Sequence, residues 1–125
     1  IPPQSKSSSS ASKERSKSRT LLLERALNAN PNDPFAWHLL GVHYHSRGSV
    51  DEAFKCFRRA ENIKSGFSAS NQYYLALCFK EKGQTNEAMS LLQSTLALPA
   101  KNTVDKKGQK EALVLLDQLR EERMA

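Results

Sequence analysis

Apolar and small residues recur at three- and four-residue steps on both sides of Gly48, a spacing that places side chains on one face of a helix. They are Trp37, Leu40, Gly41 and Tyr44 before the glycine, and Ala53, Phe57 and Ala60 after it. Asp51 and Glu52 fall early in the second stretch, where carboxylates suit the positive end of a helix dipole. A connection this short predicts two antiparallel helices, whose backbones approach closely at Gly41 and Ala53.

The same pattern returns later in the chain and, incompletely, before it. The later copy lies 35 residues on and comprises Leu75, Ala76, Phe79, Gly83, Ala88 and Leu92. This copy has Gln72 in the place of Trp37, and its extra residue falls near Gly66. Shifted back by 34 residues, only the second-helix positions remain, at Leu23, Ala26 and Pro31. We therefore expect a lone helix followed by two helix pairs.

The motif in the first pair resembles the tetratricopeptide repeat. The signature W-x2-L-G-x2-Y is present as WHLLGVHY, and A-x3-F as AFKCF. The resemblance implies an all-α solenoid of antiparallel helix pairs. Such an array leaves an apolar face uncovered at its end. The C-terminal stretch predicts an amphipathic helix that caps it, with dimerisation as the alternative role, and its apolar side comprises Ala112, Leu115, Leu116 and Leu119.

The chain of 125 residues has the composition of one globular domain, with a basic extension. Residues 1–17 are predicted to be a basic, serine-rich tail or linker, and residues 18–125 the repeat domain. Within the domain we expect a lone helix at 18–30, repeats at 34–67 and 69–100, and a capping helix at 105–123.

The net charge of +6 is concentrated at the N-terminus. Residues 1–20 hold five basic residues against the single acidic Glu14, a net of +4. The five are Lys6, Lys13, Arg15, Lys17 and Arg19. This segment is the predicted contact for an acidic partner, and the alternative is a solvated linker. It has no aromatic residues for stacking on bases, so a nucleic-acid partner is not predicted.

The repeat resemblance also implies a concave groove, lined by the first helix of each pair. The groove residues should lie opposite the packing face of those helices. They are Phe35, His38, Val42 and His45 in the first repeat, and Tyr73, Leu77 and Lys80 in the second. This set is aromatic and aliphatic with little charge. Chaperone-binding relatives hold a peptide carboxylate with lysines and asparagines, but the matching positions here are His38, Val42, Tyr73 and Leu77. The sequence therefore favours an apolar peptide as the occupant.

No motif for catalysis, metal or cofactor binding is present. The chain has no glycine-rich phosphate loop, G-x-S-x-G or HExxH. His38 and His45 share a helix face but lie about 10 Å apart along its axis, too far to share an ion. Cys56 and Cys78 are not clustered and are predicted to be buried free thiols. We predict a protein that is not an enzyme and has no cofactor, no metal and no membrane-spanning segment.

The region from residue 19 to residue 120 resembles a more specific family, the regulators of microtubule dynamics. The similarity is carried by ALNANPNDPFAWHLLG, Gly66-Phe67-Ser68, YLALCFKEKG, Leu98-Pro99 and the helix opening at Gln109-Lys110-Glu111-Ala112. It implies association with tubulin, microtubules or a spindle component, a role in chromosome segregation, and a cytoplasmic location at the cytoskeleton or spindle. The alternative is an adaptor whose groove binds an apolar peptide of another protein.

Overall fold

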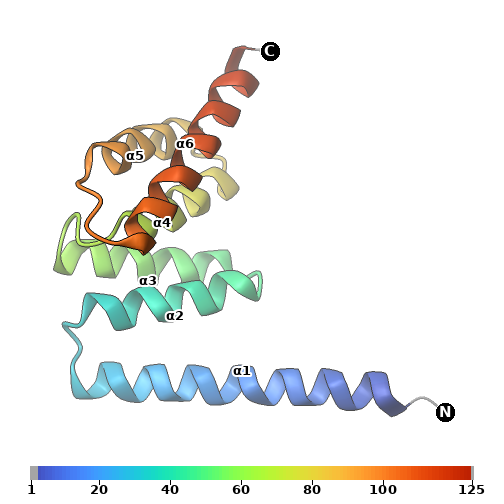
Figure 1. The fold of residues 1–125 in the computed structure, drawn as a ribbon. Coiled ribbons are helices and arrows are strands. Elements are labelled where there is room, and N and C mark those ends of the chain that lie inside the picture. Colours follow the sequence, from blue (N-terminus) through green and yellow to red (C-terminus); the bar gives the residue numbers. More distant parts are fainter. Residues whose placement is uncertain (1–2, 125) are drawn as a thin grey trace.

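The computed structural model describes residues 3–124, with the side chains of residues 3–13 and 16 outside the description. Residues 3–124 form helices and no strands, which confirms the predicted all-α class. Figure 1 shows the helices stacked in chain order, each beside the next. They are α1 (Pro3–Ala29), α2 (Pro34–Ser46), α3 (Val50–Ile63), α4 (Ala69–Glu81), α5 (Thr85–Ala97) and α6 (Thr103–Met124).

The helix ends follow from local chemistry. The carboxylate of Asp33 caps α2, where its Oδ1 accepts hydrogen bonds from the backbone N–H of Phe35 at 3.0 Å and of Ala36 at 3.4 Å. Gly48 and Gly83 take the positive φ angles of +80° and +82° that close the turns of the two helix pairs. Both turns fall where the repeat pattern predicts them.

Helix α3 lies between α2 and α4 and supplies the centre of the core. Phe57 is fully buried, and a Cβ placed on Gly41 would lie 2.6 Å from the Phe57 ring. The ring also stacks on Tyr74 of α4, with centroids 5.3 Å apart. Glycine in the middle of α2 thus admits the ring, which gives a physical reason for the glycine in the repeat signature: the two helices meet around one aromatic side chain.

Helix α6 covers α4 and α5, as predicted for a capping helix. Its four predicted apolar residues are all buried, against Leu92 and Met89 of α5. The start of α6 is fixed to the start of α4, because the buried Asp105 carboxylate accepts hydrogen bonds from the N–H groups of Ala69 and Lys101. A Cβ on Gly108 would come within 2.8 Å of the Ser70 backbone nitrogen, so the two helices touch backbone to backbone there.

Helix α1 is longer than the predicted lone helix at 18–30. It begins at Pro3, so the predicted tail at 1–17 is helical from that residue on. No proline or glycine follows Pro3 within the helix, and its many lysines, arginines, alanines and serines tolerate helical backbone. Among the described side chains of α1, contact with the core comes from Leu23 and Leu27, which pack on α2. In Figure 1 the N-terminal part of α1 extends past the end of α2.

Candidate protein-binding site

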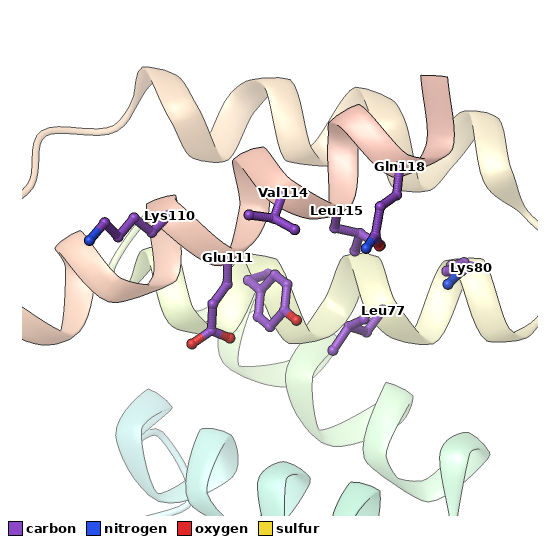
Figure 2. A pocket seen from close by; sticks show the side chains of 8 residues that line it. Leu77, Lys80, Lys110, Glu111, Val114, Leu115 and Gln118 are labelled. Carbon is purple, nitrogen blue, oxygen red and sulfur yellow. The ribbon is translucent and has the colours of Figure 1, made fainter. Parts of the chain in front are cut away.

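A groove lies between α4 and α6, and it contains three of the seven predicted groove residues. Its volume is about 460 Å³. Tyr73, Leu77 and Lys80 line it from α4. The facing wall, shown in Figure 2, comes from α6 and comprises Lys110, Glu111, Val114, Leu115 and Gln118. We call this site the α4–α6 groove.

The α4–α6 groove has apolar side chains and a cationic group on each wall. Leu77 and Val114 supply apolar surface, and Val114 is exposed. Lys80 stands on one wall and Lys110 on the other. Burial, together with the charge of Glu111 and a hydrogen bond to it, raises the pKa of the Tyr73 phenol, which stays protonated at neutral pH. The groove therefore offers an apolar surface with hydrogen-bond donors around it, suited to a peptide.

The four predicted groove residues of α2 lie elsewhere. Phe35 is 60% exposed at the start of the helix. Val42 lines a separate pocket of about 450 Å³ against α1, together with Arg19 and His43. The Nε2 atom of His45 is 2.7 Å from the Glu81 carboxylate and so bridges α2 to the end of α4. The structure thus does not unite the seven residues in one groove.

His38 departs furthest from the predicted groove position. It is only 7% exposed, and its Nδ1 atom is 2.9 Å from Oδ1 of Asn71. The rings of Phe57, Phe67 and Tyr74 surround it. Side chains from the start of α4, Asn71 and Tyr74, contact His38 and close the side of α2 that the repeat pattern predicts to be open. His38 is therefore a structural residue between two repeats.

A buried polar network that the repeat pattern does not predict joins the repeats. Asn71 donates from Nδ2 to the Phe57 carbonyl at 3.1 Å and to Glu61 at 3.3 Å. Glu61 also accepts from Gln72, whose side-chain oxygen accepts in turn from Thr95 of α5. The one sequence signal was the replacement of tryptophan by Gln72. We call His38, Glu61, Asn71, Gln72 and Thr95 the inter-repeat network.

The inter-repeat network fixes the protonation of His38. Because Asn71 uses its Nδ2 hydrogens on Phe57 and Glu61, its oxygen faces the histidine and must accept a hydrogen bond. The Nδ1 atom of His38 therefore carries a proton. Burial lowers the pKa of His38 from its usual value, and the bond to Asn71 opposes this shift in part. The ring is neutral at pH 7.

Acid should therefore destabilise the fold through His38. In the unfolded chain the histidine has a pKa of about 6.5 and takes up a proton as the pH falls below that value. In the folded chain the pKa of His38 is lower, so the ring stays neutral over part of this range and the unfolded state is favoured. The free energy of unfolding should fall by up to about 1.4 kcal/mol per pH unit for this one group. Urea unfolding at several pH values between about 7 and 5 measures the slope. His38→Gln should flatten it, and an unchanged slope in that variant would assign the acid sensitivity to other groups.

The predicted electrostatic residues lie along α1. Arg15, Lys17 and Arg19 are exposed, and Arg15 and Arg19 are one helical turn apart on the same face. The side chains of Lys6 and Lys13 lie outside the described residues. The basic segment is therefore presented on a helix, at least from Arg15 onward, rather than on an extended chain.

The described residues hold no cluster of three or more histidine, cysteine or acidic side chains that could bind a metal ion. Cys56 and Cys78 are buried free thiols, as predicted. Burial raises the pKa of Cys56 to about 11 and that of Cys78 to about 12, so both are protonated and poorly nucleophilic at neutral pH. Within residues 3–124, every helix is too short or too polar to cross a bilayer.

Comparison with known proteins places this architecture among helical repeat proteins. The type III secretion translocator chaperone SycD of Yersinia enterocolitica superposes with a TM-score of 0.79 over 97% of this chain and 83% of its own, at 16% sequence identity. At that identity the likeness shows the fold alone. The peroxisomal targeting signal receptor of Saccharomyces cerevisiae is 35% identical over 85 residues, which are 68% of this chain and 14% of the receptor.

Relatives found by sequence similarity identify the family more closely. Regulator of microtubule dynamics protein 2 of Bos taurus is 27% identical over 109 residues, covering 71% of this chain and 27% of that protein. The human protein of the same name is 25% identical over 118 residues, covering 78% of this chain and 29% of its own length. The chain thus spans less than a third of these curated relatives. The profile of the family described as regulator of microtubule dynamics protein 1-3 matches residues 44–120. These residues are more than half of the chain, which therefore belongs to the regulator of microtubule dynamics protein 1-3 family.

Proposed function

We propose that the chain is a non-enzymatic protein-interaction module of a cytoplasmic protein that binds microtubules and acts at the spindle in chromosome segregation. Membership of the regulator of microtubule dynamics family supports a microtubule-related role. The structural observation that supports direct contact is the set of exposed basic residues on α1, Arg15, Lys17 and Arg19, which lie outside the packed core.

Electrostatic attraction to tubulin is the physical basis of this proposal. Tubulin presents disordered acidic tails, which a basic helix attracts without a fixed geometry. Such attraction is screened over about 8 Å at physiological ionic strength, so binding should weaken as salt rises. The exposed basic residues of α1 would contribute to the rate and strength of association, while the packing of α1 on α2 holds the helix in place.

Co-sedimentation with taxol-stabilised microtubules across a salt series tests the proposal. The unaltered chain should pellet with microtubules at low salt and be released as salt rises. Arg15→Glu/Lys17→Glu should reduce pelleting about tenfold at low salt, since each rim charge is worth up to about 1 kcal/mol. The matched control is Lys55→Glu/Lys64→Glu, which makes the same change of net charge at exposed positions outside α1. If the control variant loses as much pelleting, the effect comes from net charge and not from the position of the residues on α1. If no form of the chain pellets, direct binding to the microtubule lattice is excluded.

A second candidate function is an adaptor that binds an apolar peptide in the α4–α6 groove. The observation that favours it is the apolar surface that Leu77 and Val114 present on the two walls of the groove. Val114→Asp should abolish the selection of apolar peptides from a displayed peptide library, because it places a charge in the groove while leaving the buried core untouched. Gln93→Asp, at an exposed position of α5, is the control. Selection of the same peptides by both variants would exclude the groove as the binding site.

A further inference from the structure

A second pocket lies on the other side of α6, between that helix and the end of α5. Its volume is about 600 Å³. Leu96 of α5 and Leu113 of α6 supply its apolar surface, and Leu113 is 47% exposed. Gln109 donates hydrogen bonds to the carbonyls of Thr95 and Leu98, which fixes α6 against the end of α5. The pocket is therefore built on a rigid junction. We call it the α5–α6 pocket.

Three lysines line this pocket and no carboxylate does. Lys106, Lys107 and Lys110 are all exposed along α6. Lys107 makes a long contact of 4.0 Å with Glu111, and within the described residues neither Lys106 nor Lys110 has a carboxylate oxygen within 4.0 Å. The acidic group nearest in sequence, Asp105, is buried and bound to backbone N–H groups. The pocket therefore presents net positive charge around an apolar cleft, with Lys106 and Lys110 free of a carboxylate partner among the described residues.

We propose that the α5–α6 pocket docks an acidic segment of a partner protein, with one apolar side chain of that segment seated between Leu96 and Leu113. Charge complementarity selects the occupant: three lysines favour carboxylates, and the leucines favour an apolar anchor. The cleft is concave and lies between two helices, so it fits an inserted side chain better than a flat bilayer surface. This site is separate from the basic residues of α1 and does not depend on the proposed microtubule contact.

The test uses a fluorescein-labelled peptide of glutamates around one central phenylalanine, with binding measured by fluorescence anisotropy. Lys106→Glu/Lys107→Glu should weaken binding about tenfold, the effect of losing about 1.4 kcal/mol. This double variant keeps Lys110 and therefore does not alter the α4–α6 groove. Its new glutamates lie in the first turns of α6, where acidic residues suit the helix dipole, so the fold should be retained. Lys55→Glu/Lys64→Glu should weaken binding much less, although its net charge is the same.

A second set of variants tests the apolar contact between the peptide and Leu113. Leu113→Ser in the protein, or serine in place of phenylalanine in the peptide, should each weaken binding several-fold. Thermal unfolding of the Leu113→Ser variant checks that its fold is intact. The proposal is overturned if the peptide fails to bind, if the two lysine double variants are equally weakened, or if the serine peptide binds as tightly. Phosphatidylserine vesicles that bind in its place, with the same lysine dependence, would assign the surface to membranes instead.

Discussion

Ala53→Trp should abolish the cooperative fold of this chain, or lower its free energy of unfolding by about 4 kcal/mol or more. Ala53 is 0% exposed and belongs to the core cluster that includes Phe57, Leu75 and Cys78. It lies on α3, which is packed by α2 on one side and by α4 on the other. Neither neighbour can move away to admit an indole ring without opening the seam between the repeats. Urea unfolding, followed by circular dichroism near the helical minimum at about 222 nm, measures the loss of free energy of unfolding.

The matched control places the same side chain at an open position. Ala97 is exposed at the end of α5, so Ala97→Trp should leave the free energy of unfolding within about 0.5 kcal/mol of the unaltered chain. The comparison removes any effect of tryptophan itself on helix propensity or solubility. If the Ala53→Trp variant keeps its native helicity and urea midpoint, Ala53 does not lie on the buried face of α3.

Periodicity predicted those parts of the fold that depend on which side of a helix is buried. The turn glycines, the helix pairs and the capping role of α6 all follow from the repeat of small and apolar residues. Gly41 is an example: its place in the signature predicts a close helix approach, and the Phe57 ring occupies the space that a side chain would fill. These features are local or repeat at a fixed spacing, so one sequence is enough to show them.

Contacts between repeats could not be predicted in the same way. His38 occupies a position that the repeat pattern assigns to the concave surface, yet it bonds to Asn71, which is 33 residues away. That pairing depends on where the non-standard junction around Gly66 places α4 relative to α2, which a local repeat pattern does not define. There the glycine has a φ angle of +73°, and its N–H donates to Glu61 of the inter-repeat network.

The length of α1 escaped prediction for a different reason. Its N-terminal half has few apolar residues, so it shows no helical periodicity from which a boundary could be placed.

The α4–α6 groove was predicted on one wall only. Tyr73, Leu77 and Lys80 follow from the repeat pattern, whereas Val114 and Lys110 depend on how the capping helix is rotated over α4. Helix amphipathicity defines the buried face of α6 but not which exposed residue meets which neighbour.

Asn71→Leu should lower the free energy of unfolding by about 3 kcal/mol, although it replaces a polar core residue with an apolar one of the same branched shape. Asn71 is 0% exposed and makes bonds to His38, to Glu61 and to the Phe57 carbonyl. A leucine cannot replace any of them. Each partner that stays buried without a bond costs about 1–3 kcal/mol, and this loss outweighs the gain from burying an aliphatic side chain. Urea unfolding measures the difference, and Asn62→Leu, at an exposed position of the preceding helix, is the control.

The pH dependence of the Asn71→Leu variant separates loss of the network from simple overpacking. The hydrogen bond to Asn71 raises the pKa of His38, so its removal should lower the folded-state pKa further below the unfolded value. The unfolded chain still takes up its proton near pH 6.5, about the usual histidine value, and the wider gap extends the loss of stability to lower pH. In the double variant His38→Gln/Asn71→Leu this additional loss in acid should disappear. If the single and double variants lose stability equally as the pH falls, the cost of Asn71→Leu comes from packing or from the lost bonds to Phe57 and Glu61, and not from its bond to His38.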